Sequence, residues 1–152
     1  MDHEKTGANI VLGVGAVVWN EREEVLLIRR RNPPRRNEWS MPGGKVEFGE
    51  TLRAALAREV REETGLEIEI AGLIDVAELV RDARAGAEDA HYVLVDYCAR
   101  ARSGEPIAAS DASEARWFSL AEIDALALWS ETRRIIAESV RLRDRMSCPP
   151  AV

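Results

Sequence analysis

The chain has 152 residues, which is the size of one domain and enough to bury a hydrophobic core. Its hydrophobic fraction of 46% is ordinary for a globular protein, and no stretch is apolar over the length that a membrane-spanning helix needs. The net charge of −6 argues against a protein that binds duplex nucleic acid, whereas a small phosphate-bearing ligand needs only a local positive site.

The two ends of the chain are polar or irregular in pattern, and residues 1–9 lack the apolar stretch of a secretion signal. We expect residues 1–9 and 147–152 to be flexible, and a single domain to span residues 1–152. Cys98 and Cys148 belong to no Cys-x-x-Cys motif, so we interpret them as free thiols in a reducing cytoplasm.

Two apolar segments near the start predict strands. Residues 10–19 are rich in valine and glycine, residues 25–30 begin with four apolar residues, and the polar turn between the two segments suggests a hairpin. Residues 29–36 then hold five arginines and two prolines, which predicts a strand end followed by a loop. Arginine makes bidentate hydrogen bonds to phosphate oxygens, so this segment is either a solvated charged loop or a phosphate-binding loop, with Arg30 and Arg35 as candidate ligands.

The stretch from Gly44 to Leu66 (GKVEFGETLRAALAREVREETGL) is the most informative part of the sequence. Apolar residues recur at helical spacing over residues 51–64, which predicts a helix docked on a sheet. In that helix Glu59, Glu62 and Glu63 share one face, where their carboxylates repel one another. We expect them to face the open side, away from the sheet. A hard divalent cation such as Mg²⁺ would turn the repulsion into coordination; the alternative is an ordinary charged helix face.

The second half of the chain predicts further strands and two helices, with a polar and flexible segment at 81–89. The expected elements are a strand, turn and strand over 66–80, a strand at 90–101, a short strand at 115–118, a short helix opened by a capping box at 119–122, and a final helix over 130–145. Strands and helices are mixed without a regular alternation. The pattern therefore predicts one α+β domain with a mixed sheet.

The informative stretch resembles the Nudix box. Its fixed positions are Gly44, Glu50 after five residues, Arg58-Glu59-Val60 after seven, then Glu62-Glu63 and Gly65-Leu66, each after one residue. The segments 39–43 and 116–118 are also similar to the family. The chain thus resembles the Nudix hydrolases, of the MutT-like or ADP-ribose pyrophosphatase-like kind. This resemblance implies an α/β/α sandwich, with the box helix on one side of the sheet and the C-terminal helix on the other.

The resemblance also implies a reaction, namely hydrolysis of a nucleoside diphosphate linked to another moiety. It implies Mg²⁺ as the cofactor, with Mn²⁺ as the alternative ion. The implied metal ligands are Glu59, Glu62, Glu63 and the carbonyl of Gly44. Arg58 is then a partner that orients the carboxylates.

Other roles stay open at the level of sequence. Gly43 and Gly44 let the backbone approach a ligand. The general base is Glu59, or else Asp111 or Glu114, which precede the Trp-Phe pair as the late acidic ligand of the family does. Asp111 and Glu114 can equally be interpreted as solvated acidic residues of a loop. Glu114 is also a candidate for contact with the substrate.

Markers elsewhere in the sequence narrow the substrate only in part. The patterns typical of NADH, coenzyme A and diadenosine polyphosphate enzymes are absent, and so is the downstream proline of many ADP-ribose pyrophosphatases. This leaves MutT-like enzymes that act on (d)NTPs and unmarked enzymes for ADP-ribose or nucleotide sugars. We expect a broad nucleotide pyrophosphohydrolase first, with ADP-ribose or another nucleotide sugar as the next substrate.

The partner we expect is a small-molecule nucleotide, with no nucleic acid and no membrane; family members are often homodimers. The alternative function is a non-catalytic Nudix domain that binds a nucleotide as a sensor or regulator. Such domains tend to lose box carboxylates, and here all are present.

Overall fold

The structure is a computed structural model, and it describes residues 9–33, 35–81, 90–102 and 104–146. The flexibility expected of residues 1–8, 82–89 and 147–152 therefore concerns parts of the chain outside the described residues. Within the described ranges, no helix is long and apolar enough to cross a membrane.

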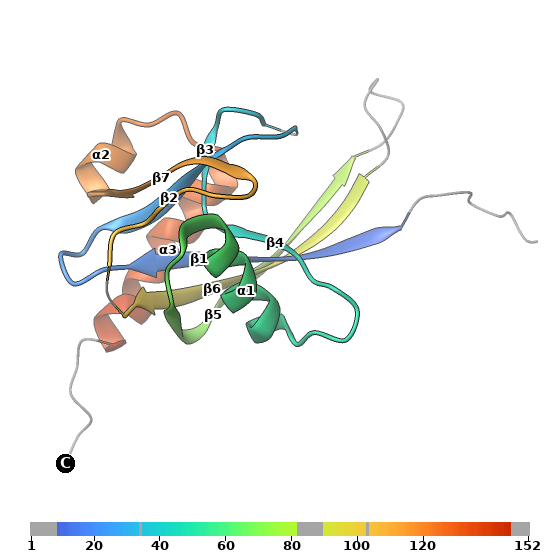
Figure 1. Cartoon of the computed structure of the whole chain (residues 1–152), viewed down its shortest axis with the longest axis horizontal. Helices are drawn as coiled ribbons and strands as arrows, with labels where there is room; N and C mark the ends of the chain where they lie inside the picture. The colour runs from blue at the N-terminus through green and yellow to red at the C-terminus, as the bar shows by residue number, and fades with distance from the viewer. Residues whose placement is uncertain (1–8, 34, 82–89, 103, 147–152) are drawn as a thin grey trace, which may run out of the picture.

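Seven strands form one mixed sheet around β1 (Ile10–Trp19) (Figure 1). Along its whole length β1 runs parallel to β6 (Ala90–Ala101), and near its middle it pairs antiparallel with the short β4 (Gly43–Lys45). β6 pairs antiparallel with β5 (Ile68–Arg81), which forms one edge of the sheet. The apolar runs that predicted strands at 10–19 and 90–101 thus become the centre of the fold.

The strand β2 (Val25–Arg30) continues from β1 through the expected turn. The two strands meet antiparallel at Trp19 and Val25. β2 then carries β7 (Ala112–Phe118) on one side and the short β3 (Trp39–Ser40) on the other, both antiparallel. This arrangement brings the arginine segment after β2 next to the start of β7.

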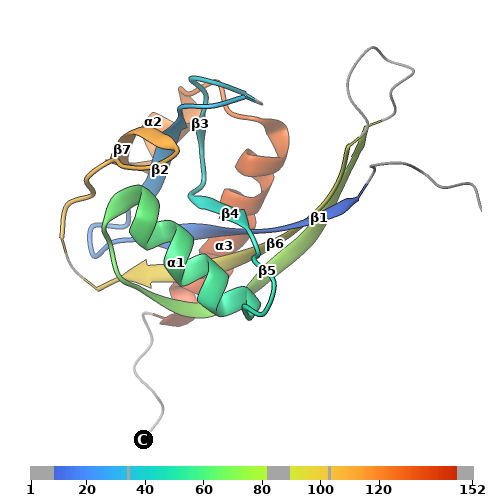
Figure 2. The ribbon, with the colours of Figure 1, turned by 45° about the vertical axis from the view of Figure 1, so that its right-hand side comes forward.

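Two helices cover the two faces of the sheet, and Figure 2 shows them on opposite sides. α1 (Leu52–Thr64) packs against one face, and α3 (Ser130–Met146) packs against the other. The short α2 (Leu120–Asp124) follows β7 and opens with the expected capping box at Ser119. The predicted α/β/α sandwich is therefore confirmed.

Each face of β1 contributes to a separate core. The α1 core contains Val14, Ala16, Val18, Leu56 and Val60, with the inward side chains of β6. The α3 core contains Val17, Trp19, Cys98, Ile135 and Ile136. The alternation of side chains along one strand thus serves both layers.

Two of the expected strand segments differ from the sequence prediction. The expected strand, turn and strand over 66–80 is wrong, because β5 is one strand of 14 residues. Its register with β6 shifts between Ile70 and Gly72 and again between Leu73 and Asp75, so the residues that suggested a turn are absorbed as bulges. β7 begins at Ala112 instead of residue 115, because Arg30 of β2 pairs with Ala112 beyond a further irregularity.

One acidic side chain, Asp96 on β6, is buried on the α3 side of the sheet. Its residue is 5% exposed. A Cβ at Gly15 on the neighbouring strand would lie 2.6 Å from Asp96 Oδ1, so the glycine leaves room for the carboxyl group. Burial, together with repulsion from Asp75, raises the pKa of Asp96 to about 6, while Arg134 opposes the shift.

This burial predicts a pH-dependent stability. The folded pKa of about 6 exceeds 3.8, the ordinary pKa of an aspartate, so the folded state holds the Asp96 proton more tightly than the unfolded state does. The resulting stability is present at low pH and is lost as the pH rises through the folded pKa. We expect Asp96→Asn to stabilise the protein near pH 8 by about 1–3 kcal/mol, and to have little effect near pH 4.

Urea unfolding across this pH range measures the difference. Asp124→Asn is the matched control, because the side chain of Asp124 is 85% exposed. The prediction fails if wild type and Asp96→Asn show parallel pH profiles.

Candidate active site

The helix α1 has well-defined ends that fix where its acidic residues lie. The hydroxyl of Thr51 accepts the N–H of Ala54 at 3.1 Å and so caps the N-terminus. Gly65 ends the helix in the left-handed conformation, with φ of 72°, and its N–H donates to the carbonyl of Arg61. Between these ends Leu56 and Val60 are fully buried against the sheet.

The glutamates of α1 do not all face solvent, so the expectation of an open acidic face is wrong. Glu63 is 2% exposed, and the side chain of Glu59 is 14% exposed. The side chain of Glu62 is 48% exposed. Glu63 lies beside the fully buried Val60 and Thr64 on the helix surface, and its carboxylate accepts a hydrogen bond from β4.

The two glycines of β4 receive the buried carboxylates. The N–H of Gly43 donates to Glu63 Oε1 at 2.8 Å. A Cβ at Gly44 would lie 2.6 Å from both carboxylate oxygens of Glu59, which is closer than a real Cβ contact. Glycine at position 44 is therefore needed for the carboxylate of Glu59 to lie against the backbone of β4.

Arg58 links the acidic residues around α1. Its Nε and Nη2 donate to the carboxylate of Glu50, both at 2.8 Å. Its Nη1 donates to Glu59 at 2.9 Å and to Glu62 at 3.3 Å. Its Nη2 also reaches the carbonyl of Lys45 at 3.1 Å. Arg58 thus binds Glu50, Glu59 and Glu62 together, and the orienting role that the resemblance implies for it stays a prediction.

The electrostatics of the site favour proton uptake by the buried acids. Burial raises the pKa of Glu63 to about 8 against the hydrogen bond from Gly43, and the charges of Glu59 and Asp111 add to the shift. Burial also raises the pKa of Glu59, while Arg58 lowers it. The charges of Glu59 and Asp111 therefore raise the pKa of Glu63, and the charge of Asp111 also raises the pKa of Glu59.

Asp111 is held beside the helix by two sets of contacts. The N–H groups of Ile107 and Ala109 donate to the last carbonyls of α1, at 2.9 and 3.1 Å, so this segment crosses the C-terminus of the helix. On the other side, Asn32 Nδ2 donates to Asp111 Oδ1 at 2.9 Å, and the N–H of Arg31 donates to the Asp111 carbonyl at 2.9 Å. No sequence pattern singled out Asn32, an amide within a charged loop.

The predicted substrate contacts fall into two groups. Arg30 lies close enough to the carboxylates for its charge to lower the pKa of Glu63. Arg35 instead lies over the ring of Trp129, 4.3 Å from the centroid. Glu114 pairs across the β2–β7 ladder with Arg29 at 2.9 Å. Of these three side chains, the structure therefore brings only that of Arg30 into electrostatic contact with Glu63.

The donor groups of the site fit a hard divalent cation. They are the carboxylates of Glu59 and Glu63, which repel each other, and the carbonyl of Gly44. Position 44 has to be glycine, because a side chain there would occupy the space of the Glu59 carboxylate. Across the described part of the chain, no three His, Cys, Asp or Glu side chains already form a set that could hold a metal. In the structure Arg58 binds Glu59 and Glu62, and the N–H of Gly43 binds Glu63.

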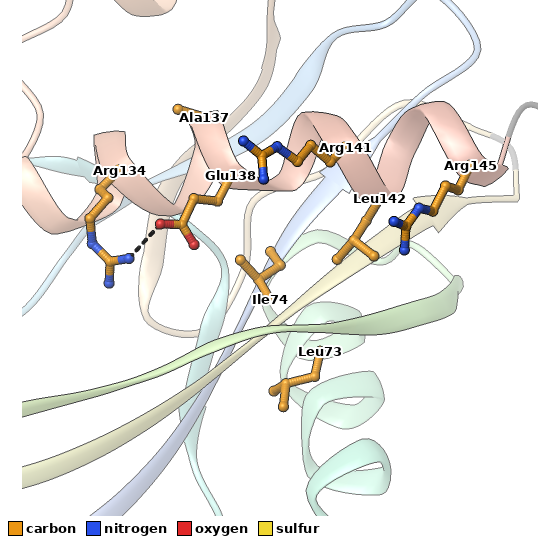
Figure 3. A pocket seen from close by; sticks show the side chains of 8 residues that line it. All are labelled: Leu73, Ile74, Arg134, Ala137, Glu138, Arg141, Leu142 and Arg145. Atoms are coloured by element: carbon orange, nitrogen blue, oxygen red, sulfur yellow. Dashed lines mark hydrogen bonds and ion pairs between the residues drawn. The ribbon is translucent and has the colours of Figure 1, made fainter.

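A separate groove of about 660 Å³ lies between β5 and α3. In Figure 3 the side chains of Ile74 and Leu142 lie between the strand and the helix, and Arg134, Arg141 and Arg145 are spaced along α3. Because α3 covers the opposite face of the sheet from α1, this groove is distinct from the carboxylate site (Figure 2).

Comparison with known proteins places this site in a family. The sequence model of the NUDIX domain matches residues 10–139. The ADP-ribose pyrophosphatase of Methanocaldococcus jannaschii is 35% identical over 122 residues, which are 80% of this chain and 68% of that protein. The 8-oxo-dGDP phosphatase of Homo sapiens is 44% identical over 70 residues, which are 46% of this chain but only 22% of that protein.

A solved structure agrees with the fold. The NUDIX domain of Shewanella oneidensis NrtR, in complex with ADP ribose, superposes with a TM-score of 0.73 and 25% identity. The match covers 96% of this chain and 94% of that chain. The similarity therefore extends over nearly the whole of both chains, well beyond the Nudix box.

The close approach at Gly44 predicts a sensitive position. Gly44→Ala would push the carboxylate of Glu59 away from β4, and we expect it to weaken Mn²⁺ binding by about 10-fold or more while the fold is kept. Gly72→Ala is the matched control, because its Cβ would meet only Leu142 at 3.9 Å. Titration of Mn²⁺ by electron paramagnetic resonance checks this. Equal affinities in the two variants would contradict the assigned site.

The raised pKa of Glu63 predicts that protons compete with the metal. Since the folded group holds its proton up to about pH 8, metal affinity should rise with pH and level off above that value. The same titration at several pH values measures the slope. Glu63→Gln should lose most of the slope, whereas Glu67→Gln, on an exposed residue paired with Arg61, should retain it. A slope unchanged in Glu63→Gln would show that another group controls binding.

Proposed function

The chain belongs to the NUDIX family and is a Nudix hydrolase, and we propose that it uses a divalent metal ion to hydrolyse a phosphoanhydride bond in a nucleoside diphosphate linked to another moiety. The observation that carries the proposal is the pair of buried carboxylates, Glu59 and Glu63, held against the glycine backbone of β4. A buried pair of like charges is unfavourable for the fold alone, and it becomes favourable when a cation binds.

The arrangement suits attack on an anionic phosphorus. Mg²⁺ would supply positive charge to the phosphate oxygens and make a bound water more acidic. The protein would hold this ion through the carboxylates of Glu59 and Glu63 and the carbonyl of Gly44. Arg30, whose charge lowers the pKa of Glu63, is our candidate for contact with a phosphate oxygen of the substrate.

The same residues provide a route for the proton of the attacking water. Glu59 is the first candidate for the base, because burial raises its pKa towards the range in which a carboxylate accepts a proton effectively. Arg58 fixes the orientation of that carboxylate through its 2.9 Å hydrogen bond. Asp111 is the second candidate, and Asn32 holds its carboxylate in place.

Among substrates, we favour ADP-ribose. The relative named as an ADP-ribose pyrophosphatase matches 80% of this chain, whereas the relative named as an 8-oxo-dGDP phosphatase matches 46%. The similar NUDIX domain of Shewanella oneidensis was crystallised with ADP ribose, and it matches nearly the whole chain. A (d)NTP or its oxidised form is the second candidate, supported by the relatives that match across the box.

The test is a panel of ADP-ribose, nucleotide sugars, NADH, (d)NTPs, 8-oxo-dGTP and dinucleoside polyphosphates, assayed with Mg²⁺ and with EDTA. We expect metal-dependent hydrolysis, fastest with ADP-ribose. Glu59→Gln and Glu63→Gln should each lower turnover by about 10³-fold, because each removes a charge that acts on the reacting groups.

The control is Glu67→Gln, a glutamate in an exposed ion pair just beyond the helix, which should keep its activity. Circular dichroism monitors the fold of each variant. Unchanged turnover in folded Glu59→Gln and Glu63→Gln would contradict the mechanism. Nucleotide binding without turnover on any substrate would favour the sensor function instead.

A further inference from the structure

The groove between β5 and α3 has the size of a small-molecule site. Its volume of about 660 Å³ falls within the range of about 300–1,000 Å³ that is typical of such sites. The groove lies at the edge of the sheet that β5 forms, on the face opposite the carboxylate site. The hydrolysis proposed above uses none of the residues that line it.

The floor of the groove is apolar. Ile74 of β5 and Leu142 of α3 are both half-buried and lie at the margin of the α3 core. In Figure 3 their side chains lie between the strand and the helix. Gly72 adds no side chain to this floor, and among the described atoms a Cβ there would meet only Leu142 Cδ2, at 3.9 Å. Space beside Leu142 is thus left for an apolar group of a ligand.

The wall that α3 contributes is mostly basic. Positions 134, 138, 141 and 145 are spaced four, three and four residues apart, so their side chains form one stripe along the helix. The stripe holds three positive charges against one negative charge, whereas the chain as a whole carries a net charge of −6. The residues of this stripe are Arg134, Glu138, Arg141 and Arg145.

The two ends of the stripe differ in how their charges are paired. Arg134 donates to Asp75 of β5 at 3.0 Å and to Glu138 at 2.9 Å. Arg141 and Arg145 form an ion pair with no residue in the described part of the chain, although the other three arginines of α3 each do so. Both are exposed, and they lie one turn apart, where like charges repel each other. An anion bound between them would remove that repulsion.

We propose that this groove binds a small organic anion, with its apolar body over Ile74 and Leu142 and its anionic group between Arg141 and Arg145. Guanidinium groups make strong, paired hydrogen bonds to carboxylate, sulfonate and phosphate oxygens. The apolar floor adds the free energy of removing apolar surface from water. Because the site is a groove and not a flat surface, the ligand is a free molecule in solution. The proposal is independent of the reaction at the carboxylate site.

A matched pair of fluorescent probes tests the chemistry of the ligand. 1-Anilinonaphthalene-8-sulfonate carries a sulfonate on apolar rings, and N-phenyl-1-naphthylamine has the same rings without the charge. We expect the sulfonate probe to bind wild type with a Kd on the order of 10 µM. The uncharged probe should bind about 10-fold more weakly, because it makes no charge-assisted hydrogen bond. Inorganic sulfate, which lacks the apolar body, should compete only at about 100-fold higher concentration.

Two variants locate the bound probe in the groove. Combining Arg141→Gln with Arg145→Gln removes both guanidinium groups, and it should weaken binding of the sulfonate probe by about 10-fold, to the affinity of the uncharged probe. Ala137→Trp would fill space in the groove from an exposed position, and it should weaken binding of both probes by about 10-fold or more. Arg53→Gln is the matched control, because it removes an exposed arginine of α1, on the other face of the sheet. It should bind both probes as wild type does.

Circular dichroism monitors the fold of each variant. Equal affinities of wild type for the two probes would overturn the proposal, because the charge of the ligand would then play no part. An unchanged affinity for the sulfonate probe in the folded double variant and in folded Ala137→Trp would overturn it too. Binding to vesicles of phosphatidylglycerol without binding of the free sulfonate probe would assign these arginines to a membrane surface, and it would likewise overturn the proposal.

Discussion

The close approach of two carboxylates to a glycine backbone is the constraint on which the site depends. Glu63 accepts the N–H of Gly43 from a buried position, and Glu59 occupies the space that a side chain at position 44 would take. A Cβ at Gly43 would in turn collide with the backbone of β1 at Val14, so β4 is pressed between α1 and the central strand. The helix, the glycine strand and β1 therefore form one packed unit, and neither glycine tolerates a side chain without movement of its neighbours.

This packing sets the electrostatic state of the site. Burial disfavours the ionisation of both acids, and the charges of Glu59 and Asp111 further disfavour that of Glu63. Arg58 compensates for only part of the repulsion, because its strongest hydrogen bonds go to Glu50 at the outer end of the cluster. The unfavourable charge that remains favours the uptake of a proton. Under the proposed function the same charge also favours the binding of a divalent ion, so protons and the ion would compete for these carboxylates.

The sequence was sufficient to predict most of the elements but not all of their relations. Apolar runs located β1, β2 and β6, the helical spacing of apolar residues located α1, and a capping box located α2. β5 was misjudged because Gly72 and Asp75 are typical turn residues, and only the long partner strand β6 absorbs them as bulges. That information is non-local. A strand with a partner along its whole length tolerates two irregularities that a pattern within 15 residues cannot distinguish from a turn.

The same limit applies to the site. The spacing of the box identified the acidic residues, but helical periodicity placed Glu59, Glu62 and Glu63 on one face and could not say how that face is rotated against the sheet. The rotation follows from the packing of Leu56 and Val60 together with the glycines of β4.

Contacts between segments that lie far apart in the sequence likewise could not be predicted from local sequence patterns. Asn32 and Asp111 are 79 residues apart, and they meet only because β2 and β7 pair and bring their loops together. The loop after β2 and Asp111 are consequently connected by hydrogen bonds. A movement of the loop after β2 would change the orientation of Asp111 as well as the position of Arg30, so any loop adjustment on substrate binding would act on the phosphate contact and on the candidate base together.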